Sequence, residues 1–273
     1  MSEIITVRAS SFADFADCPA RWHAKHIEGK RMPSGPAAII GKAIHAGTAA
    51  FDTSTMNGDG LSIDDAAGAL VDTLNKPDEE VDWSADDKWT PREAESVSLV
   101  LHSKYCREIA PKRRYVEVEA DLGSVEIAVD TAGVTVCITG HTDRVRVDDA
   151  GREGISDIKS GGRIVSTEGK VETKGHAYQL AAYSLLRQVS SGKPLTAPAE
   201  IIGLNTGKTT VAQRVAVGQT NNVESTLLGV GEKPGLIQAM AHAARDGMFF
   251  GNPKSMLCNE KYCPVYKTCN FRR

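Results

Sequence analysis

Residues 155–161 (ISDIKSG) place a carboxylate and an amine two positions apart in a segment typical of a β-strand. Alternate side chains of a strand face the same way, so Asp157 and Lys159 project from one face. The carboxylate can hold Mg²⁺ or Mn²⁺, which prefer oxygen ligands. The lysine can orient or help deprotonate an attacking water, or neutralise a phosphate. The pattern suits metal-dependent hydrolysis, although D-x-K by itself is more often a surface ion pair.

A second carboxylate and a polar helix face flank this pair. Asp143 lies in the preceding segment TGHTDRV, and a turn at 148–151 (DDAG) would set that strand beside Asp157. Downstream, Gln179 and Tyr183 are four residues apart on a predicted helix and share one face. Both can hydrogen-bond a phosphate or a base, and tyrosine can stack on a base. Taken alone, the same two residues would suit a half-buried helix face.

Other residues near the predicted strands are less specific. GKAIH places His45 on an Ala-rich helix, where a single histidine is more often packed or solvated than a metal ligand. Glu117 and Glu119 precede the Asp143 strand and could add an acidic contact, but a solvated strand face is the favoured interpretation. The basic residues close enough in sequence to contact phosphates, or to form a solvated face, are Arg144, Arg146 and Lys174.

The elements that must position these residues form an α/β pattern. Ser10 and Ser11 can cap an N-terminal helix, and Pro19 predicts a break within it. From residue 115 the chain changes to short, β-branched, alternating segments. Helices are predicted over 37–52, 64–75, 91–109, 175–190 and 221–246, and strands over 115–129, 134–149, 153–161, 200–207 and 209–217. This order indicates a sheet covered by helices.

The cysteines form a second candidate site. Three of the six lie in the last 16 residues, where Cys258, Cys263 and Cys269 give C-x4-C-x5-C, and Cys18 is the candidate for a fourth ligand. In a reducing compartment such clustering indicates a metal site rather than disulfides. Four thiolates suit Zn²⁺ or an iron–sulfur cluster. The isolated cysteines, expected to be buried free thiols, are Cys106 and Cys137.

The order of the motifs resembles the RecB-like branch of the PD-(D/E)XK nucleases. The motifs are G-x-x-x-H at 41–45, G-x-x-D at 140–143, D-x-K at 157–159 and Q-x-x-x-Y at 179–183. The resemblance implies a restriction-endonuclease-like core, with a central mixed β-sheet flanked by helices. It also implies that Lys159 serves the attacking water, with Ser156 standing where the family name has proline. The implied Mg²⁺ or Mn²⁺ ligands are His45, Asp143, Asp157 and the backbone carbonyl of Ile158, and the implied DNA contacts are Gln179 and Tyr183.

The cysteine pattern resembles the iron–sulfur staple of AddB-type helicase-nuclease subunits and CRISPR-adaptation exonucleases. In those proteins one cysteine precedes the nuclease core and three follow it. The resemblance implies a structural [4Fe–4S] cluster, with Zn²⁺ as the alternative, on Cys18, Cys258, Cys263 and Cys269. Joining Cys18 to the distant triplet would also remove loop entropy from the unfolded chain.

Composition and length limit the possible classes of protein but do not identify the function. The 273 residues carry a net charge of −3, so any basic surface for nucleic acid must be local. No apolar stretch suits a membrane span or a signal peptide, so a cytoplasmic location is expected. We expect one nuclease domain over 1–273: a mainly helical region at 1–110, an α/β core at 111–220, and a C-terminal helix with a cysteine-rich tail at 221–273 that packs against the Cys18 segment.

The sequence therefore favours a Mg²⁺- or Mn²⁺-dependent DNA exonuclease. Its substrate would be single-stranded DNA or duplex ends in recombination, repair or phage DNA processing. The chain has no helicase motor, so a helicase, recombination or CRISPR-adaptation protein would be a separate partner, and an oligomer is compatible with the superfamily. The alternatives are a catalytically silent DNA-end-binding or complex-assembly module that keeps the fold, and a zinc-stapled protein with unrelated chemistry.

Overall fold

A mixed β-sheet forms the centre of the molecule in the computed structural model, which describes residues 3–85, 88–221 and 224–272. The six-stranded sheet has the order β1-β3-β4-β5-β6, and β2 pairs with the other edge of β3. The parallel pairs are β1 with β3 and β4 with β5, and the remaining pairs are antiparallel. The strands are β1 (Glu3–Arg8), β2 (Arg114–Val129), β3 (Val134–Val147), β4 (Glu153–Gly161), β5 (Ala199–Asn205) and β6 (Val215–Thr220).

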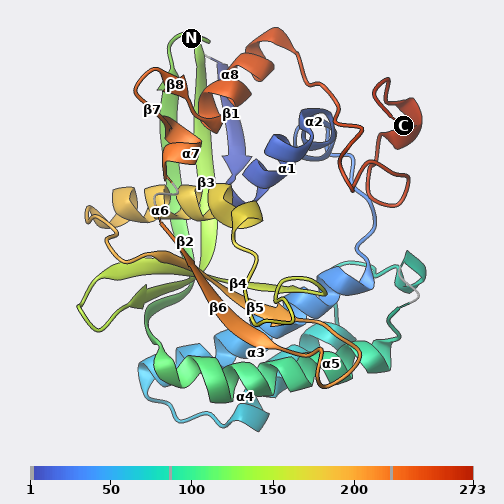
Figure 1. The fold of residues 1–273 in the computed structure, drawn as a ribbon, viewed down its shortest axis with the longest axis vertical. Helices are drawn as coiled ribbons and strands as arrows, with labels where there is room; N and C mark the ends of the chain where they lie inside the picture. Colours follow the sequence, from blue (N-terminus) through green and yellow to red (C-terminus); the bar gives the residue numbers. More distant parts are fainter. Residues whose placement is uncertain (1–2, 86–87, 222–223, 273) are drawn as a thin grey trace.

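Helices cover both faces of this sheet (Figure 1). They are α1 (Phe12–Asp17), α2 (Pro19–His26), α3 (Pro36–Asn57), α4 (Ile63–Asn75), α5 (Pro91–Lys104), α6 (Ala177–Ser191), α7 (Glu224–Leu228) and α8 (Leu236–Asp246). On one face, α6 packs over Ile155 of β4 and Ile201 of β5. On the other, α3 and α5 pack over Ile158 and Ile202. This alternation follows from the two-residue period of a strand, and it puts Asp157 and Lys159 on the α6 face.

The β3–β4 hairpin brings the candidate carboxylates together. Its turn contains Gly151 at φ +76°, a left-handed conformation that glycine adopts without steric cost. Arg144 of β3 lies opposite Ser156 of β4, so the Asp143 and Asp157 backbones are on neighbouring strands. The predicted hairpin is confirmed, and so is the helix break at Pro19, which separates α1 from α2.

The predicted continuous helix over 221–246 is confirmed only in part, leaving aside 222–223, which lie outside the described residues. The chain instead forms α7, a two-stranded ribbon of β7 (Gly229–Val230) and β8 (Lys233–Pro234), and then α8. A side chain at Gly229 would place its Cβ 2.3 Å from the Lys233 carbonyl oxygen, and φ there is +82°. Glycine and proline in the middle of the segment therefore override its helical periodicity.

Two strand predictions also change. The terminal strand β1 was not anticipated, because its parallel partner β3 is more than 120 residues away along the chain. The strand predicted over 209–217 begins only at Val215, and the preceding residues form a turn closed by hydrogen bonds from Ala212 and Gln213 to Thr209. Among the described residues, no helix combines the length and apolar character needed to cross a lipid bilayer.

Candidate active site

Asp157 forms the floor of the candidate site. Its carboxylate Oδ2 lies 2.7 Å from the Lys159 ammonium, two residues along the same face of β4. The Asp157 side chain is 1% exposed and that of Lys159 is 22% exposed. Burial raises the pKa of Asp157 to about 6, with a further contribution from Asp143, although Lys159 opposes the shift. This carboxyl therefore gives up its proton less readily than an exposed aspartate does.

The pKa of Asp143 is shifted in the opposite direction from that of Asp157. The Ile158 N–H donates to its Oδ2 at 2.6 Å, and Nδ1 of His45 on α3 lies 3.4 Å from its Oδ1. Burial alone would raise the pKa of Asp143, but His45, Lys159 and the Ile158 N–H together hold it well below its usual range. Burial lowers the pKa of His45, and Asp143 more than reverses that shift. Asp143 is therefore a charged carboxylate beside an imidazole.

Glu119 of β2 is an acidic neighbour that the sequence interpretation assigned to a solvated strand face. One ligand atom each from His45, Glu119 and Asp143 lie within 4.8 Å of one another, a spacing that could hold a metal ion. Glu119 has a φ of +50°, rare for a residue with a side chain and typical of strained functional positions. Glu117, by contrast, pairs with Arg187 at 2.7 Å. The register of β2 on β3 explains this position, because Glu119 lies between Val118, which pairs with Arg144, and Ala120, which pairs with Thr142.

Gln179 and Tyr183 of α6 complete the wall above Asp157. The Gln179 Nε2 donates to the Tyr183 hydroxyl at 2.8 Å and lies 3.4 Å from Asp157 Oδ1. A Cβ at Gly140 would lie 2.6 Å from a Leu186 methyl carbon and 3.2 Å from the Tyr183 ring, so only glycine allows α6 this close to β3. Both polar side chains are mostly buried, and their hydrogen bonds connect them to Asp157.

Exposure shows from which side the site is reached. The exposed fraction of the side chains rises from 1% at Asp157 through 28% at His45 to 40% at Glu119. Glu119 and His45 are therefore closer to solvent than Asp157, which is the deepest of the three. Four elements, α3, β2, β3 and β4, supply the ionisable groups, and α6 covers them.

A sequence profile of the PD-(D/E)XK nuclease superfamily matches residues 6–270. The chain belongs to this superfamily. Nucleases of the superfamily use divalent metal ions, and the mixed sheet flanked by helices fits their restriction-endonuclease-like core. Among solved structures, the crystal structure of SSO0001 aligns with 98% of this chain and 87% of its own, at 14% identity and a TM-score of 0.43. No curated protein matches the chain.

Neither sequence-based alternative for Arg144 and Arg146, a phosphate contact or a solvated face, is correct, because both side chains are buried. Arg144 is fully buried: its Nε donates to Asp52 at 2.7 Å and its NH1 donates to Glu119 at 2.9 Å. Arg146 is 5% exposed and lies 3.3 Å from Glu200. Arg144 also donates to the Asp143 carbonyl at 2.6 Å, so it supports two acidic groups of the site from behind.

Replacing Arg144 by methionine is expected to cost about 3–5 kcal/mol of folding free energy, because it leaves the buried Asp52 charge uncompensated. Urea unfolding followed by circular dichroism measures the loss. The matched control is Arg152→Met, which breaks a half-exposed pair with Asp148 at 2.8 Å and should cost less than about 1 kcal/mol. Equal losses in the two variants would contradict the structural role of Arg144.

Glu119→Gln is expected to weaken Mn²⁺ binding by about tenfold or more, because it removes a charge from the exposed side of the group that could hold a metal ion. Titration calorimetry with Mn²⁺ measures the affinity. Glu117→Gln is the control, since that neighbouring carboxylate faces Arg187 instead of the site. If the two variants bind Mn²⁺ alike, Glu119 is not part of the metal site.

The cysteine-rich tail packs against α1 and α2, at the opposite end of the chain (Figure 1). The Ser255 hydroxyl donates to Asp17 at 2.6 Å and accepts from Arg21 at 3.2 Å. The Asn252 N–H lies 3.4 Å from the Cys18 sulfur. The four cysteines predicted to share a site line one small pocket: Cys18, Cys258, Cys263 and Cys269. The other two cysteines lie elsewhere, in the segment after α5 and in β3.

Proposed function

We propose that this chain is a Mg²⁺- or Mn²⁺-dependent DNA exonuclease acting on single-stranded DNA or duplex ends. The observation that carries the proposal is the convergence of His45, Asp143, Asp157 and Lys159 within one hydrogen-bonded group. They come from α3 and from the β3–β4 hairpin, so His45 is far from the other three along the chain, and they occupy the motif positions at which the RecB-like nucleases carry their site. A surface ion pair would not require this convergence.

The donor set fits a hard divalent cation. The proposed ligands are imidazole nitrogen and carboxylate oxygen atoms of His45, Asp143 and Asp157, with the Ile158 carbonyl and with Glu119 at the open edge. When bound, Mg²⁺ or Mn²⁺ lowers the pKa of a ligated water and stabilises negative charge on the phosphate. The raised pKa of Asp157 supports this role, because a buried carboxyl that is hard to ionise alone is stabilised as a carboxylate by a cation.

Lys159 is proposed to orient the attacking water and to donate to the phosphate. Burial lowers its pKa, but the Asp157 and Asp143 carboxylates more than offset this, so the ammonium stays charged. A charged ammonium donates hydrogen bonds rather than accepting a proton, which favours positioning over general-base catalysis. Gln179 is proposed to hold Asp157 and, with Tyr183, to lie against the substrate strand.

Cleavage assays test the proposal. Purified protein should degrade labelled single-stranded or duplex DNA with Mg²⁺ or Mn²⁺ and not with EDTA. Tight DNA binding without metal-dependent cleavage would instead support the catalytically silent DNA-end-binding module.

The four cysteines of the tail pocket are proposed to hold a structural [4Fe–4S] cluster. Their gathering from both ends of the chain supports this, as does the backbone N–H directed at the Cys18 sulfur, since such hydrogen bonds are common at cluster thiolates. A brown protein with absorbance near ~400 nm and about four iron atoms per chain is the expected result. Colourless protein with one zinc per chain after anaerobic purification would replace the cluster by Zn²⁺.

A further inference from the structure

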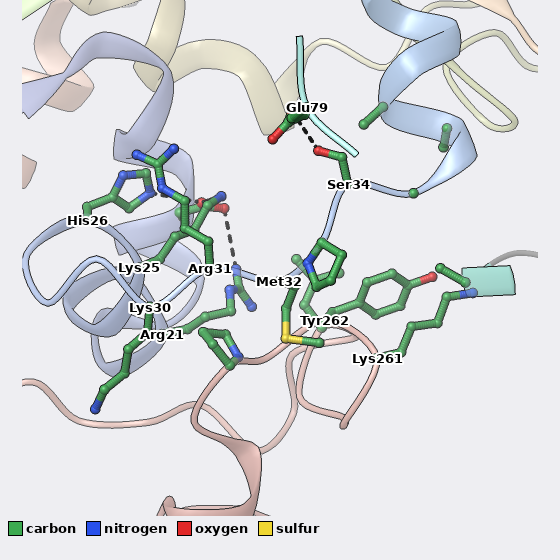
Figure 2. Close-up of a pocket in the computed structure, with 18 of the residues that line it drawn as sticks. Arg21, Lys25, His26, Lys30, Arg31, Met32, Ser34, Glu79, Lys261 and Tyr262 are labelled. Carbon is green, nitrogen blue, oxygen red and sulfur yellow. Dashed lines mark hydrogen bonds and ion pairs between the residues drawn. The ribbon is translucent and has the colours of Figure 1, made fainter. Parts of the chain in front are cut away.

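A basic pocket lies beside the candidate active site, between α2, the loop that follows it and the tail (Figure 2). Its volume of about 540 Å³ is in the range of ligand-binding pockets. The tail contributes Lys261 and Tyr262, which lie in the short loop between Cys258 and Cys263. The Lys and Arg residues that line it are Arg8, Arg21, Lys25, Lys30, Arg31 and Lys261, and the carboxylates are Asp14 and Glu79.

The positive charge of this pocket is only partly neutralised. Asp14 forms ion pairs with Lys25 at 2.8 Å and with Arg21 at 3.5 Å. Glu79 forms an ion pair with Lys42 and accepts a hydrogen bond from Ser34. Within the part of the chain that the structure describes, Arg8, Arg31 and Lys261 form no ion pair, and all three are exposed. In a chain with a net charge of −3, this local excess of cations marks a site for an anionic ligand.

An aromatic face accompanies the cations. Tyr262 is 47% exposed, and its ring lies 5.3 Å from the Lys261 ammonium. In Figure 2, Tyr262 and Lys261 lie on one side of Met32, and Lys25, His26 and Arg31 lie on the other. Positive grooves with an exposed aromatic ring suit single-stranded nucleic acid, because the cations follow phosphates and the ring stacks on an unpaired base.

The pocket shares lining residues with a smaller pocket that reaches Tyr183 of the candidate site. Arg8 and Ser10, which line it, also line a smaller pocket with Gly140 and Tyr183. Tyr183 in turn accepts from Gln179, which contacts Asp157. Shared lining residues and hydrogen bonds therefore link this pocket to Asp157 by way of Tyr183 and Gln179.

We propose that this pocket binds the backbone of an unpaired DNA strand whose neighbouring phosphodiester lies in the active site, with a base stacked on Tyr262. Arg8, Arg31 and Lys261 contact its phosphates. This assignment rests on the proposed nuclease function and adds to it a strand path and a preference for single-stranded substrate.

The test measures binding separately from cleavage. Fluorescence anisotropy with a labelled 15-nucleotide oligothymidylate is recorded at several salt concentrations, using Asp157→Asn protein so that the probe survives. Adding Arg31→Glu and Lys261→Glu should weaken binding more than tenfold and lower the salt slope by about 1.4, or about 0.7 for each phosphate that is no longer neutralised. Tyr262→Ala should weaken binding about tenfold with little change in slope, and Tyr262→Phe should restore it.

The matched control is the double variant Lys193→Glu with Lys233→Glu, which reverses the charge of two exposed lysines that lie outside both pockets. Thermal melts check that every variant is folded. If the pocket variants bind the probe as the control does, the strand path is overturned. If a 15-base-pair duplex binds as tightly and depends equally on Tyr262, the assignment to an unpaired strand is overturned.

Cleavage distinguishes this inference from the proposed function. With Asp157 intact, the pocket variants should cleave bis(p-nitrophenyl) phosphate, which is too small to reach the pocket, at the unaltered rate. DNA cleavage should fall through a higher KM. A protein that cleaves nothing but loses probe binding in the pocket variants would keep the strand path and reject the nuclease. Unchanged KM for DNA in an active enzyme would reject the strand path alone.

Discussion

Asp157→Asn is expected to reduce metal-dependent DNA cleavage by on the order of 10³-fold while leaving the protein folded. A bound metal contributes several kcal/mol of charge stabilisation, and each 1.36 kcal/mol corresponds to a factor of ten in rate. Asparagine has the shape of aspartate and can still accept from Gln179, but it offers no negative charge to a cation or to Lys159. The rate is measured with labelled DNA and saturating Mn²⁺.

Lys159→Ala should give a comparable loss, because it removes the cation beside the buried carboxylate. The combined variant should lose little more than either alone, since residues that act as a unit are not additive. Asp130→Asn is the control: it changes an exposed carboxylate in the turn after β2. Retained cleavage in Asp157→Asn or Lys159→Ala would remove these two residues from the mechanism.

Cys263→Ala is expected to abolish the absorbance near ~400 nm and to lower Tm by more than about 10 °C. Cys263 is 9% exposed and lies in the pocket that it shares with Cys18, 245 positions earlier in the chain (263 − 18). A cluster that bridges the two closes a very long loop, and its binding energy becomes folding energy. In a chain of this size about 1 kcal/mol shifts Tm by 2–4 °C.

Two cysteines outside the pocket provide the control. Cys106 is 2% exposed and does not line the pocket that holds the other four cysteines, and burial raises the pKa of its thiol to about 12. Cys106→Ala and Cys137→Ala should keep the colour and the iron content. Calorimetry measures Tm, and iron analysis measures the iron content, for all three variants. Loss of iron in Cys106→Ala with retention in Cys263→Ala would contradict the ligand assignment.

The sequence by itself predicted those parts of the site that depend on local geometry. Asp157 and Lys159 share a face because a strand repeats every two residues, and Gln179 and Tyr183 share one because they are a helical turn apart. The short turn at 148–151 was enough to place Asp143 beside them. These relations are set by neighbours in the chain, so spacing and turn residues reveal them.

Only the tertiary structure decided the parts that depend on distant neighbours. Glu119 and Arg144 differ in role from their sequence-based interpretations because the register of β2 on β3 and the burial of Asp52 behind them determine where each side chain points. The basic pocket likewise unites Arg8 and Arg31 with Lys261 and Tyr262 from the other end of the chain. Such groups are invisible to local periodicity, because their proximity comes from packing of the whole sheet and its covering segments.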